Sequence, residues 1–289
     1  MPRYDVHQHL WPESLVAALT RRREPPCLEA AVCDLGPEGR FAFDPSAHDL
    51  DARIAELDRD ETDVAVVSLQ PTLAFDGLAE DERAELVAAY HEGIAEVVGA
   101  AGGRVRAFAA GAALDGFAGA TVAAPAVVAG GPELDDLAGA LERRGQVLFV
   151  HPGPCHVPAG APGWWAAVVD YTAQMQAAYL AWLSRRAEGG PRPAAIFAVL
   201  AGGGPIQAER LTTRGVSDRF PVDAHVYFDV AGYGPRALEL CLATFGTRQF
   251  VFGSDAPVLD PRSALRTVGS FGEAVAEVIR AENPMLLFG

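Results

Sequence analysis

The feature that most constrains this sequence is an end-to-end alternation of short apolar runs with longer helical patterns. Strands that alternate with helices are typical of a parallel sheet, and eight such repeats predict an α/β fold of the (β/α)8 TIM barrel type. The predicted strands are residues 4–9, 63–70, 105–112, 120–127, 146–150, 194–200, 226–230 and 250–254. The predicted helices include residues 49–59, 81–101, 132–144, 163–186, 235–245 and 263–282. A single barrel domain over residues 1–289 accounts for the pattern.

Reactive side chains stand at the ends of several predicted strands. His7 and His9 end the first strand, His151 ends the fifth, and Asp255 ends the eighth. His7 and His9 point the same way because side chains alternate between the two faces of a strand. The active site of such a barrel lies at the C-terminal strand ends, and imidazoles are good ligands for divalent transition metals. The sequence therefore predicts a metal site there, with Asp229 on strand seven as a partner for a ligand histidine.

Five motifs, taken in order along nearly the whole chain, carry a family resemblance. They are DVHQH at strand one, DARIAELDRDETDVAVVSLQP, HPG at strand five, GSDAP at strand eight and the closing ENPMLLFG. Together they resemble the amidohydrolase superfamily, and within it the amidohydrolase-2 branch that contains the aminocarboxymuconate-semialdehyde decarboxylase-like enzymes. The resemblance implies one divalent metal, with zinc expected and manganese or iron as alternatives. It implies His7, His9, His151 and Asp255 as ligands, and Asp255 can also accept a proton from metal-activated water.

Strand six departs from the pattern of that family. The family usually ends this strand with a histidine followed by glycines, whereas here Ala201, or Gly202 with a one-residue shift, fills the histidine position. The backbone N–H groups of Gly202 and Gly203 are candidates for binding an anionic substrate, although a tight strand-to-helix turn is the simpler interpretation. His156, in the loop after strand five, is the candidate that replaces the missing acid–base group.

Aromatic residues near the expected rim are candidates for shaping a substrate pocket. Trp11 and Trp164 are the predicted substrate-binding residues, and Trp165 is open to the same interpretation. Packing of a long helix onto its neighbours is the alternative, and it is the favoured one for Trp182. Of the remaining histidines, His48 and His91 are expected at the surface, and His225 at the opposite end of the barrel.

Three functions are compatible with these residues. The first is a metal-dependent hydrolase of a small amide, ester or lactone, which needs a metal, a water and a proton acceptor. The second is a non-oxidative decarboxylase of an aromatic or unsaturated acid, which depends more on the missing histidine because carbon must be protonated. The third is a catalytically impaired barrel that only binds a ligand or partner. The retained ligand set favours an enzyme, and the hydrolase is the main prediction.

Composition narrows the partners and the compartment. The net charge of −15 repels nucleic acid and anionic membranes, so we expect a small-molecule substrate. A homodimer is also possible as a protein partner. All 23 basic residues counted as Lys+Arg are arginine, so no carboxylated lysine can bridge two metals. The four cysteines show no disulfide-rich or zinc-finger spacing, no apolar run reaches the length of a membrane span, and a ligand at position 7 leaves no room for a signal peptide. A cytoplasmic location is therefore expected.

Overall fold

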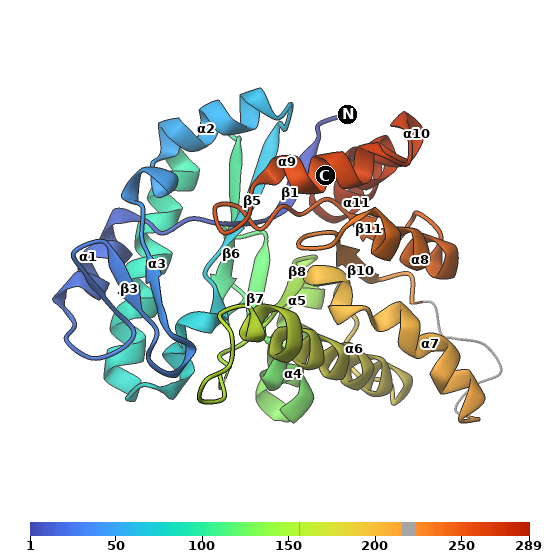
Figure 1. The fold of residues 1–289 in the computed structure, drawn as a ribbon, viewed down its shortest axis with the longest axis horizontal. Helices are drawn as coiled ribbons and strands as arrows, with labels where there is room; N and C mark the ends of the chain where they lie inside the picture. Colours follow the sequence, from blue (N-terminus) through green and yellow to red (C-terminus); the bar gives the residue numbers. More distant parts are fainter. Residues whose placement is uncertain (156, 216–222) are drawn as a thin grey trace.

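The predicted barrel is present in the computed structural model, which describes residues 1–155, 157–215 and 223–289 (Figure 1). Within these residues, eight parallel strands pair in the order in which they follow one another along the chain. The first strand also meets the segment that follows the last, because Val6 N donates to Phe252 O at 2.8 Å and His9 N to Ala256 O at 2.7 Å. The strands are β1 (Tyr4–His9), β5 (Val64–Ser68), β6 (Val105–Ala110), β7 (Gly119–Ala123), β8 (Val147–His151), β9 (Ala195–Phe197), β10 (Val226–Asp229) and β11 (Phe250–Val251). The predicted fold class is confirmed.

Helices cover the outside of this barrel. They are α1 (Glu13–Arg21), α2 (Leu50–Arg59), α3 (Glu80–Ala100), α4 (Ala124–Ala129), α5 (Pro132–Arg144), α6 (Tyr171–Ala187), α7 (Gly204–Thr213), α8 (Pro235–Phe245), α9 (Pro261–Gly269), α10 (Glu273–Glu277) and α11 (Asn283–Phe288). Local sequence explains several of their ends. The Asp49 side chain accepts a hydrogen bond from Ala52 N at 2.9 Å and caps α2, and Gly145 ends α5 in the left-handed conformation. None of the described helices is both long and apolar enough to cross a membrane.

Six predicted strands are shorter in the structure. Those predicted at 63–70, 105–112, 226–230 and 250–254 end at Ser68, Ala110, Asp229 and Val251, and the other two have clear local causes. The prediction for residues 120–127 is wrong beyond Ala123, because α4 begins at Ala124 with Pro125 in its first turn, where a missing N–H costs nothing. The prediction for residues 194–200 is wrong beyond Phe197. Val199, Leu200 and Ala201 have positive φ angles of 48°, 51° and 49°, so the chain turns out of the strand there.

Two predicted helices are interrupted. Residues 263–282 are not one helix: α9 ends at Gly269, Gly272 adopts a φ of +88°, and α10 then leads into a π-helical turn, Val278–Glu282. In the predicted helix 163–186, the α-helix begins only at Tyr171, after a π-helical turn at Ala166–Asp170. Apolar periodicity does not report backbone angles, so it did not reveal these breaks.

An insertion after β1 was missed by the sequence patterns. It consists of α1 and a separate antiparallel sheet of β2 (Cys27–Glu29), β3 (Val32–Asp34) and β4 (Arg40–Ala42). Strands of three residues are too short to give a reliable alternation. Conversely, the described residues 111–118, between β6 and β7, contain no helix, although a regular barrel has one after each strand.

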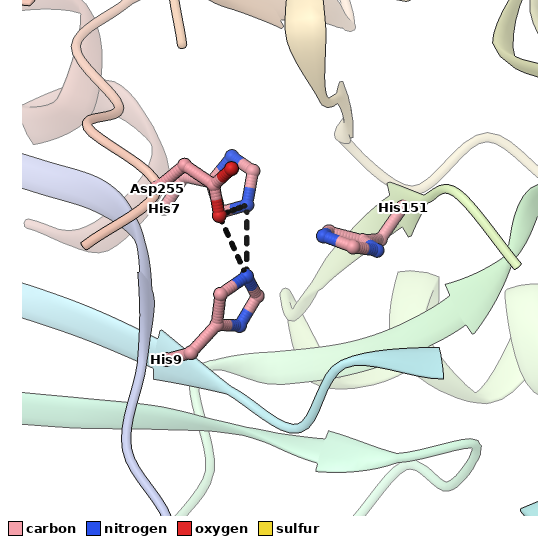
Figure 2. Close-up of side chains that lie close together, drawn as sticks. All are labelled: His7, His9, His151 and Asp255. Carbon is pink, nitrogen blue, oxygen red and sulfur yellow. Dashed lines mark hydrogen bonds and ion pairs between the residues drawn. The ribbon is translucent and has the colours of Figure 1, made fainter. Parts of the chain in front are cut away.

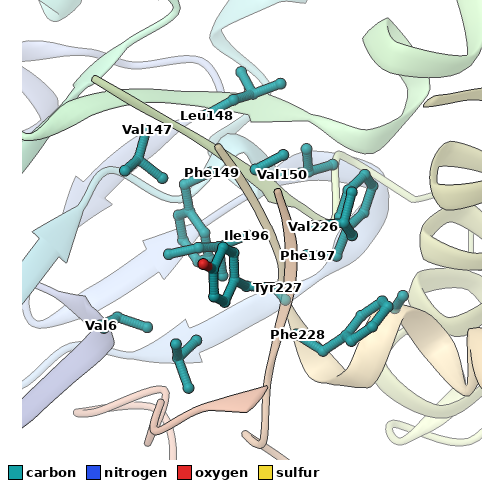
Figure 3. Packing of buried hydrophobic residues seen from close by; sticks show 14 of the residues in the cluster. Val6, Val147, Leu148, Phe149, Val150, Ile196, Phe197, Val226, Tyr227 and Phe228 are labelled. Atoms are coloured by element: carbon teal, nitrogen blue, oxygen red, sulfur yellow. The ribbon is translucent and has the colours of Figure 1, made fainter. Parts of the chain in front are cut away.

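Aromatic and branched side chains fill the interior (Figure 3). Val6, Phe149 and Ile196 come from three different strands and are fully buried. Phe228 of β10 lies on the outer side of its strand, where it packs on Tyr179 of α6 and Phe245 of α8. A filled interior of this kind fixes the strand ends relative to one another, so side chains carried by distant strands keep a constant spacing at the rim.

Candidate metal centre

Three histidines and one aspartate meet at the C-terminal end of the barrel (Figure 2). One ligand atom from each of His7, His9, His151 and Asp255 lies within 4.8 Å of the others. His7 and His9 come from β1 and His151 from β8, whereas Asp255 lies four residues beyond β11. All four predicted ligands are therefore brought together, and the three histidine side chains are buried.

Hydrogen bonds fix the orientation of the histidine rings. Asp229 Oδ2 lies 2.8 Å from His7 Nδ1, as expected of a residue on β10 that supports a ligand histidine. Ser68 O lies 3.1 Å from His9 Nδ1. With both Nδ1 atoms engaged, the two Nε2 atoms face each other at 3.2 Å, and Asp255 Oδ1 lies 3.1 Å from His9 Nε2 and 3.5 Å from His7 Nε2. His151 Nδ1 contacts Pro152 O at 2.9 Å, which leaves its Nε2 available as well.

The position of Asp255 depends on an unusual backbone. Asp255 has a φ of +63°, and its N–H donates to His7 O at 2.8 Å. A non-glycine residue in this region is uncommon and marks a position that its surroundings hold in place. Gly253 allows the approach, because a Cβ there would lie 2.7 Å from His7 Cβ and 2.9 Å from Asp229 Cβ. The glycine of the GSDAP motif is thus required by close packing.

Burial and neighbouring charges shift the pKa values of the cluster in different directions. Burial alone lowers the pKa of His7, but the carboxylates of Asp229 and Asp255 outweigh it and raise that pKa to about 9. Burial lowers the pKa values of His9 and His151, and the nearby carboxylate of Asp255 opposes this shift only in part. Burial raises the pKa of Asp255, yet its contacts with His7 and His9 bring the net value below the ordinary one. Near neutral pH, Asp255 is therefore an ionised carboxylate, and the raised pKa of His7 favours the protonated ring.

The end of β9 differs from the sequence-based expectation. Gly202 faces α6: a Cβ on it would lie 2.2 Å from Thr172 O, and Gln176 Nε2 donates to Gly202 O at 2.6 Å. Ala201 is fully buried in the apolar core. The expectation that one of these two residues fills the position of the histidine at the rim is therefore wrong, because the left-handed turn directs them away. Val199 is the residue that reaches the cluster, since its N–H donates to Asp229 Oδ1 at 3.0 Å.

The glycines after β9 form a tight turn. Gly203 has a φ of +79°, and its N–H donates to Leu200 O at 3.0 Å within that turn. This backbone donor is engaged inside the protein, so the interpretation as a strand-to-helix turn explains Gly203 better than substrate binding does. His156, the predicted substitute for the missing histidine, lies outside the described residues.

The two predicted substrate-binding tryptophans have different surroundings. Trp11 is buried, stacks on Phe43 and His48 with ring centroids 5.2 and 5.3 Å apart, and donates from Nε1 to Gln70 Oε1 at 2.6 Å. Trp164 is 57% exposed and stacks on Trp165 at 6.3 Å, in the segment before α6. Trp11 therefore packs the insertion against the barrel, while Trp164 presents an open aromatic face.

The other histidines and Trp182 complete the comparison with the sequence. Trp182 is buried in the core, as favoured. His225 is exposed and precedes β10, at the opposite end of the barrel. The prediction that His48 and His91 are surface residues is wrong, because both are half-buried. His48 accepts a hydrogen bond from Trp11 N at 3.0 Å, and His91 accepts one from Ala110 N at 2.9 Å.

Glu38 is a carboxyl group near the rim that the sequence patterns missed. It lies between β3 and β4, and it accepts hydrogen bonds from the Tyr171 hydroxyl and, at 3.3 Å, from Cys155 N. Burial raises the pKa of its carboxyl to about 7. Cys155 is four residues past His151, so Glu38 joins the insertion to the loop that follows a predicted ligand. An isolated glutamate in a short turn gives no sequence signal for such a contact.

Several solved structures share the fold of this chain. No family model and no curated protein sequence matches the chain. The apo structure of IDCase from Metarhizium anisopliae aligns with a TM-score of 0.78 and 19% identity, over 99% of this chain and 97% of that one. A structure described as amidohydrolase II aligns with a TM-score of 0.75 and 18% identity over 99% of both chains. Dihydroxybenzoic acid decarboxylase from a Polaromonas species, solved with manganese and the inhibitor 2-nitroresorcinol, aligns at 0.69 and 14% identity over 99% and 96%.

These alignments show that the chain shares its fold with these proteins, one of which is described as an amidohydrolase II. Each of them covers nearly the whole chain, so the likeness extends over the whole barrel. At identities below 20% the likeness establishes the fold but not the reaction. The chemistry has to be argued from the site of this chain.

Proposed function

We propose that this protein is a metal-dependent, non-oxidative decarboxylase of a small aromatic or unsaturated carboxylic acid. The observation that carries the proposal is the cluster of three histidines and one aspartate, with ligand atoms within 4.8 Å of one another, in a barrel whose similar solved structures include aromatic-acid decarboxylases. The order of the two main hypotheses is thereby reversed, since the sequence alone favoured the hydrolase.

The residues fit one divalent ion. Two imidazole nitrogens 3.2 Å apart need either a proton or a cation between them, and both rings are held so that only their Nε2 atoms are free. Three imidazoles and a carboxylate suit zinc, manganese or iron. A bound ion would supply positive charge that orients the substrate carboxylate and stabilises negative charge on the reacting carbon.

Decarboxylation requires a proton to replace the carboxyl group. The bond between the ring carbon and the carboxylate breaks, CO2 leaves, the electron pair stays on carbon, and a general acid donates a proton there. Asp255 is the acid–base group of the cluster, but its pKa is held below the ordinary value. It must therefore first accept a proton, for example from a substrate hydroxyl, before it delivers one to carbon.

A second candidate is the hydrolysis of an amide, ester or lactone. The lowered pKa of Asp255 favours it, because an ionised carboxylate beside two ligand histidines suits a base that accepts a proton from water. The third hypothesis, a catalytically impaired barrel, is disfavoured because all four proposed ligands are present and lie close together.

Three finer features belong to the same proposal. Manganese in the Polaromonas decarboxylase supports manganese as an alternative to zinc here. All four cysteines are free, which fits a reducing cytoplasm. A small-molecule substrate suits a buried cluster of this size, and a homodimer stays a prediction.

The deciding experiment loads purified protein with manganese or zinc and incubates it in D2O with hydroxylated benzoates. Release of CO2, together with one deuterium at the vacated ring carbon, is the expected result. A parallel panel of aryl amides, esters and lactones tests the second candidate. Hydrolysis of any of these, with no CO2 from the acids, would overturn the decarboxylase proposal.

A further inference from the structure

Three buried polar side chains from the sequence motifs have no part in the proposed metal centre so far. Asp5 and Gln8 belong to the DVHQH motif on β1, and Arg53 belongs to α2. Each of the three is between 1% and 3% exposed. Charged side chains are rarely buried so completely unless they are paired, so the contacts of these residues show what they do.

The first contact compensates for an irregularity in β1. Asp5 pairs with Ala65 of β5, and Gln8 pairs with Val67. Three residue steps of β1 therefore face two steps of β5, so β1 holds one extra residue there. A bulge of this kind disrupts the regular ladder of backbone hydrogen bonds. The N–H of His7, inside the bulge, donates to Asp5 Oδ1 at 3.3 Å.

Asp5 also holds the segment that carries Asp255. Its Oδ1 accepts a second hydrogen bond, from Ser254 N at 3.0 Å, and Ser254 directly precedes Asp255 in the chain. One buried carboxylate oxygen therefore binds the backbone of His7 and the backbone next to the aspartate ligand. Because Asp255 N also donates to His7 O at 2.8 Å, the two segments are joined by several hydrogen bonds.

Gln8 and Arg53 connect this carboxylate to α2. Gln8 Nε2 donates to Asp5 Oδ2 at 2.8 Å, and Arg53 Nη1 donates to Gln8 Oε1 at 3.0 Å. A side-chain amide has one donor end and one acceptor end, so it fits between a carboxylate and a guanidinium group. Arg53 Nη2 donates to Ala47 O at 2.5 Å and to His9 O at 3.4 Å, which is the backbone of a second predicted ligand.

We propose that Asp5, Gln8 and Arg53 are positioning residues, which set the geometry of the metal centre through the backbone of its ligands. The inference rests on the proposed function, because it needs a metal ion at the cluster. Within the described residues, none of the three belongs to the group of possible ligands. They act by holding the β1 bulge and the segment before Asp255, so their loss changes how tightly and in which geometry the ion is bound.

Titration of the full chain with cobalt(II) tests the proposal, because the absorption spectrum of bound cobalt reports its coordination geometry. Gln8→Met nearly keeps the length of the side chain but removes both ends of the amide. We expect this variant to bind cobalt roughly 10- to 100-fold more weakly than wild type, with a changed spectrum. Arg53→Lys keeps the positive charge but loses the fork that reaches three oxygens, so a loss of about two- to tenfold is expected.

Gln249→Met is the matched control. Gln249 is also a buried amide, and its Nε2 donates to Asp223 O at 2.7 Å and to Val226 O at 2.9 Å. It precedes β11 and therefore lies at the opposite end of the barrel from the cluster. Its replacement also removes buried hydrogen bonds, but it should leave the affinity for cobalt and the spectrum unchanged.

The outcomes separate this inference from the proposed function. A wild-type protein that binds no cobalt, manganese or zinc overturns both. If wild type binds metal and Gln8→Met keeps the same affinity and spectrum, or if Gln249→Met weakens binding as much, the inference alone is wrong. If Gln8→Met does not fold, Arg53→Lys decides in its place, and an unchanged affinity and spectrum of that variant refute the inference.

Discussion

At the scale of single residues, the proposed metal centre depends on the groups that orient the proposed ligands as much as on those ligands. Asp229 and Ser68 turn the two β1 histidines so that their Nε2 atoms face each other. Gly253 lets the loop after β11 approach β1 closely enough to place Asp255 beside them. The cluster is therefore sensitive to changes that touch no metal ligand.

Asp255→Asn separates ligation from proton transfer. An amide cannot accept the proton, so turnover with saturating metal should fall by roughly 10²–10⁴-fold if Asp255 is the acid–base group. Turnover is measured on protein whose metal content matches wild type. Near-normal turnover of the fully metallated variant would contradict this role and direct attention to His156 or Asp229.

Gly253→Ala tests the close approach. The added methyl group would lie 2.7 Å from His7 Cβ, so the loop must shift, at a cost of about 1–3 kcal/mol in unfolding free energy and with weaker metal binding. Gly99→Ala is the control, because a Cβ there has nothing within 4 Å and alanine favours its helix α3. Chemical unfolding and metal titration of both variants check the contrast. Equal behaviour of the two would argue against steric closeness at Gly253.

At the scale of elements, the insertion after β1 is tied to the rim through Glu38. Its carboxyl contacts Tyr171, which begins α6, and Cys155 in the loop after β8. Three segments far apart in the sequence therefore meet at one partly buried acid, whose pKa is raised to about 7 by burial.

This contact predicts a pH dependence of stability. The folded-state pKa of Glu38, about 7, lies above the ordinary value of 4.5, so the folded state holds the proton more tightly. The contribution of Glu38 is fully present below about pH 4.5 and is lost as the pH rises to about 7. The stability advantage of wild type over Glu38→Gln should therefore shrink between pH 5 and pH 8, as followed by thermal unfolding. An advantage over this variant that grows with pH would refute the assignment.

The control for that experiment is Glu29→Gln. Glu29 lies on β2 of the same insertion, is exposed, and makes no side-chain hydrogen bond or ion pair in the described structure. Its replacement removes the same charge without the rim contact. The difference from wild type should stay constant over the same pH range.

At the scale of the whole molecule, one metal ion should join three segments, one from each end of the chain and one from its middle. Its ligands come from β1, β8 and the loop after β11, so binding stabilises the folded barrel and not the unfolded chain. An ion at 100 times its dissociation constant adds about 2.7 kcal/mol to the unfolding free energy.

The prediction is one ion per chain, lost together with its thermal stabilisation in the His7→Ala/His9→Ala double variant. Elemental analysis and thermal unfolding with and without a chelator measure both quantities. The absence of lysine excludes a carboxylated bridge, so a second ion is not expected. Two fully occupied ions about 3.5–4 Å apart in anomalous diffraction would contradict this prediction.

The sequence by itself determined the barrel and the four predicted ligands. Strand periodicity, and the rule that parallel strands end at one rim, are local and topological, so His7, His9, His151 and Asp255 could be brought together before any coordinates existed. The same reasoning identified Asp229, because β10 ends at the same rim as the strands that carry the histidines.

Only the tertiary structure decided what the turns and the insertion do. The left-handed residues after β9 turned Ala201 and Gly202 away from the rim and brought Val199 to Asp229, and apolar periodicity carries no information on such backbone angles. The contact of Glu38 with Tyr171 spans 133 residues of chain. Contacts between distant segments, and spaces left between them, depend on packing in three dimensions, which no local pattern encodes.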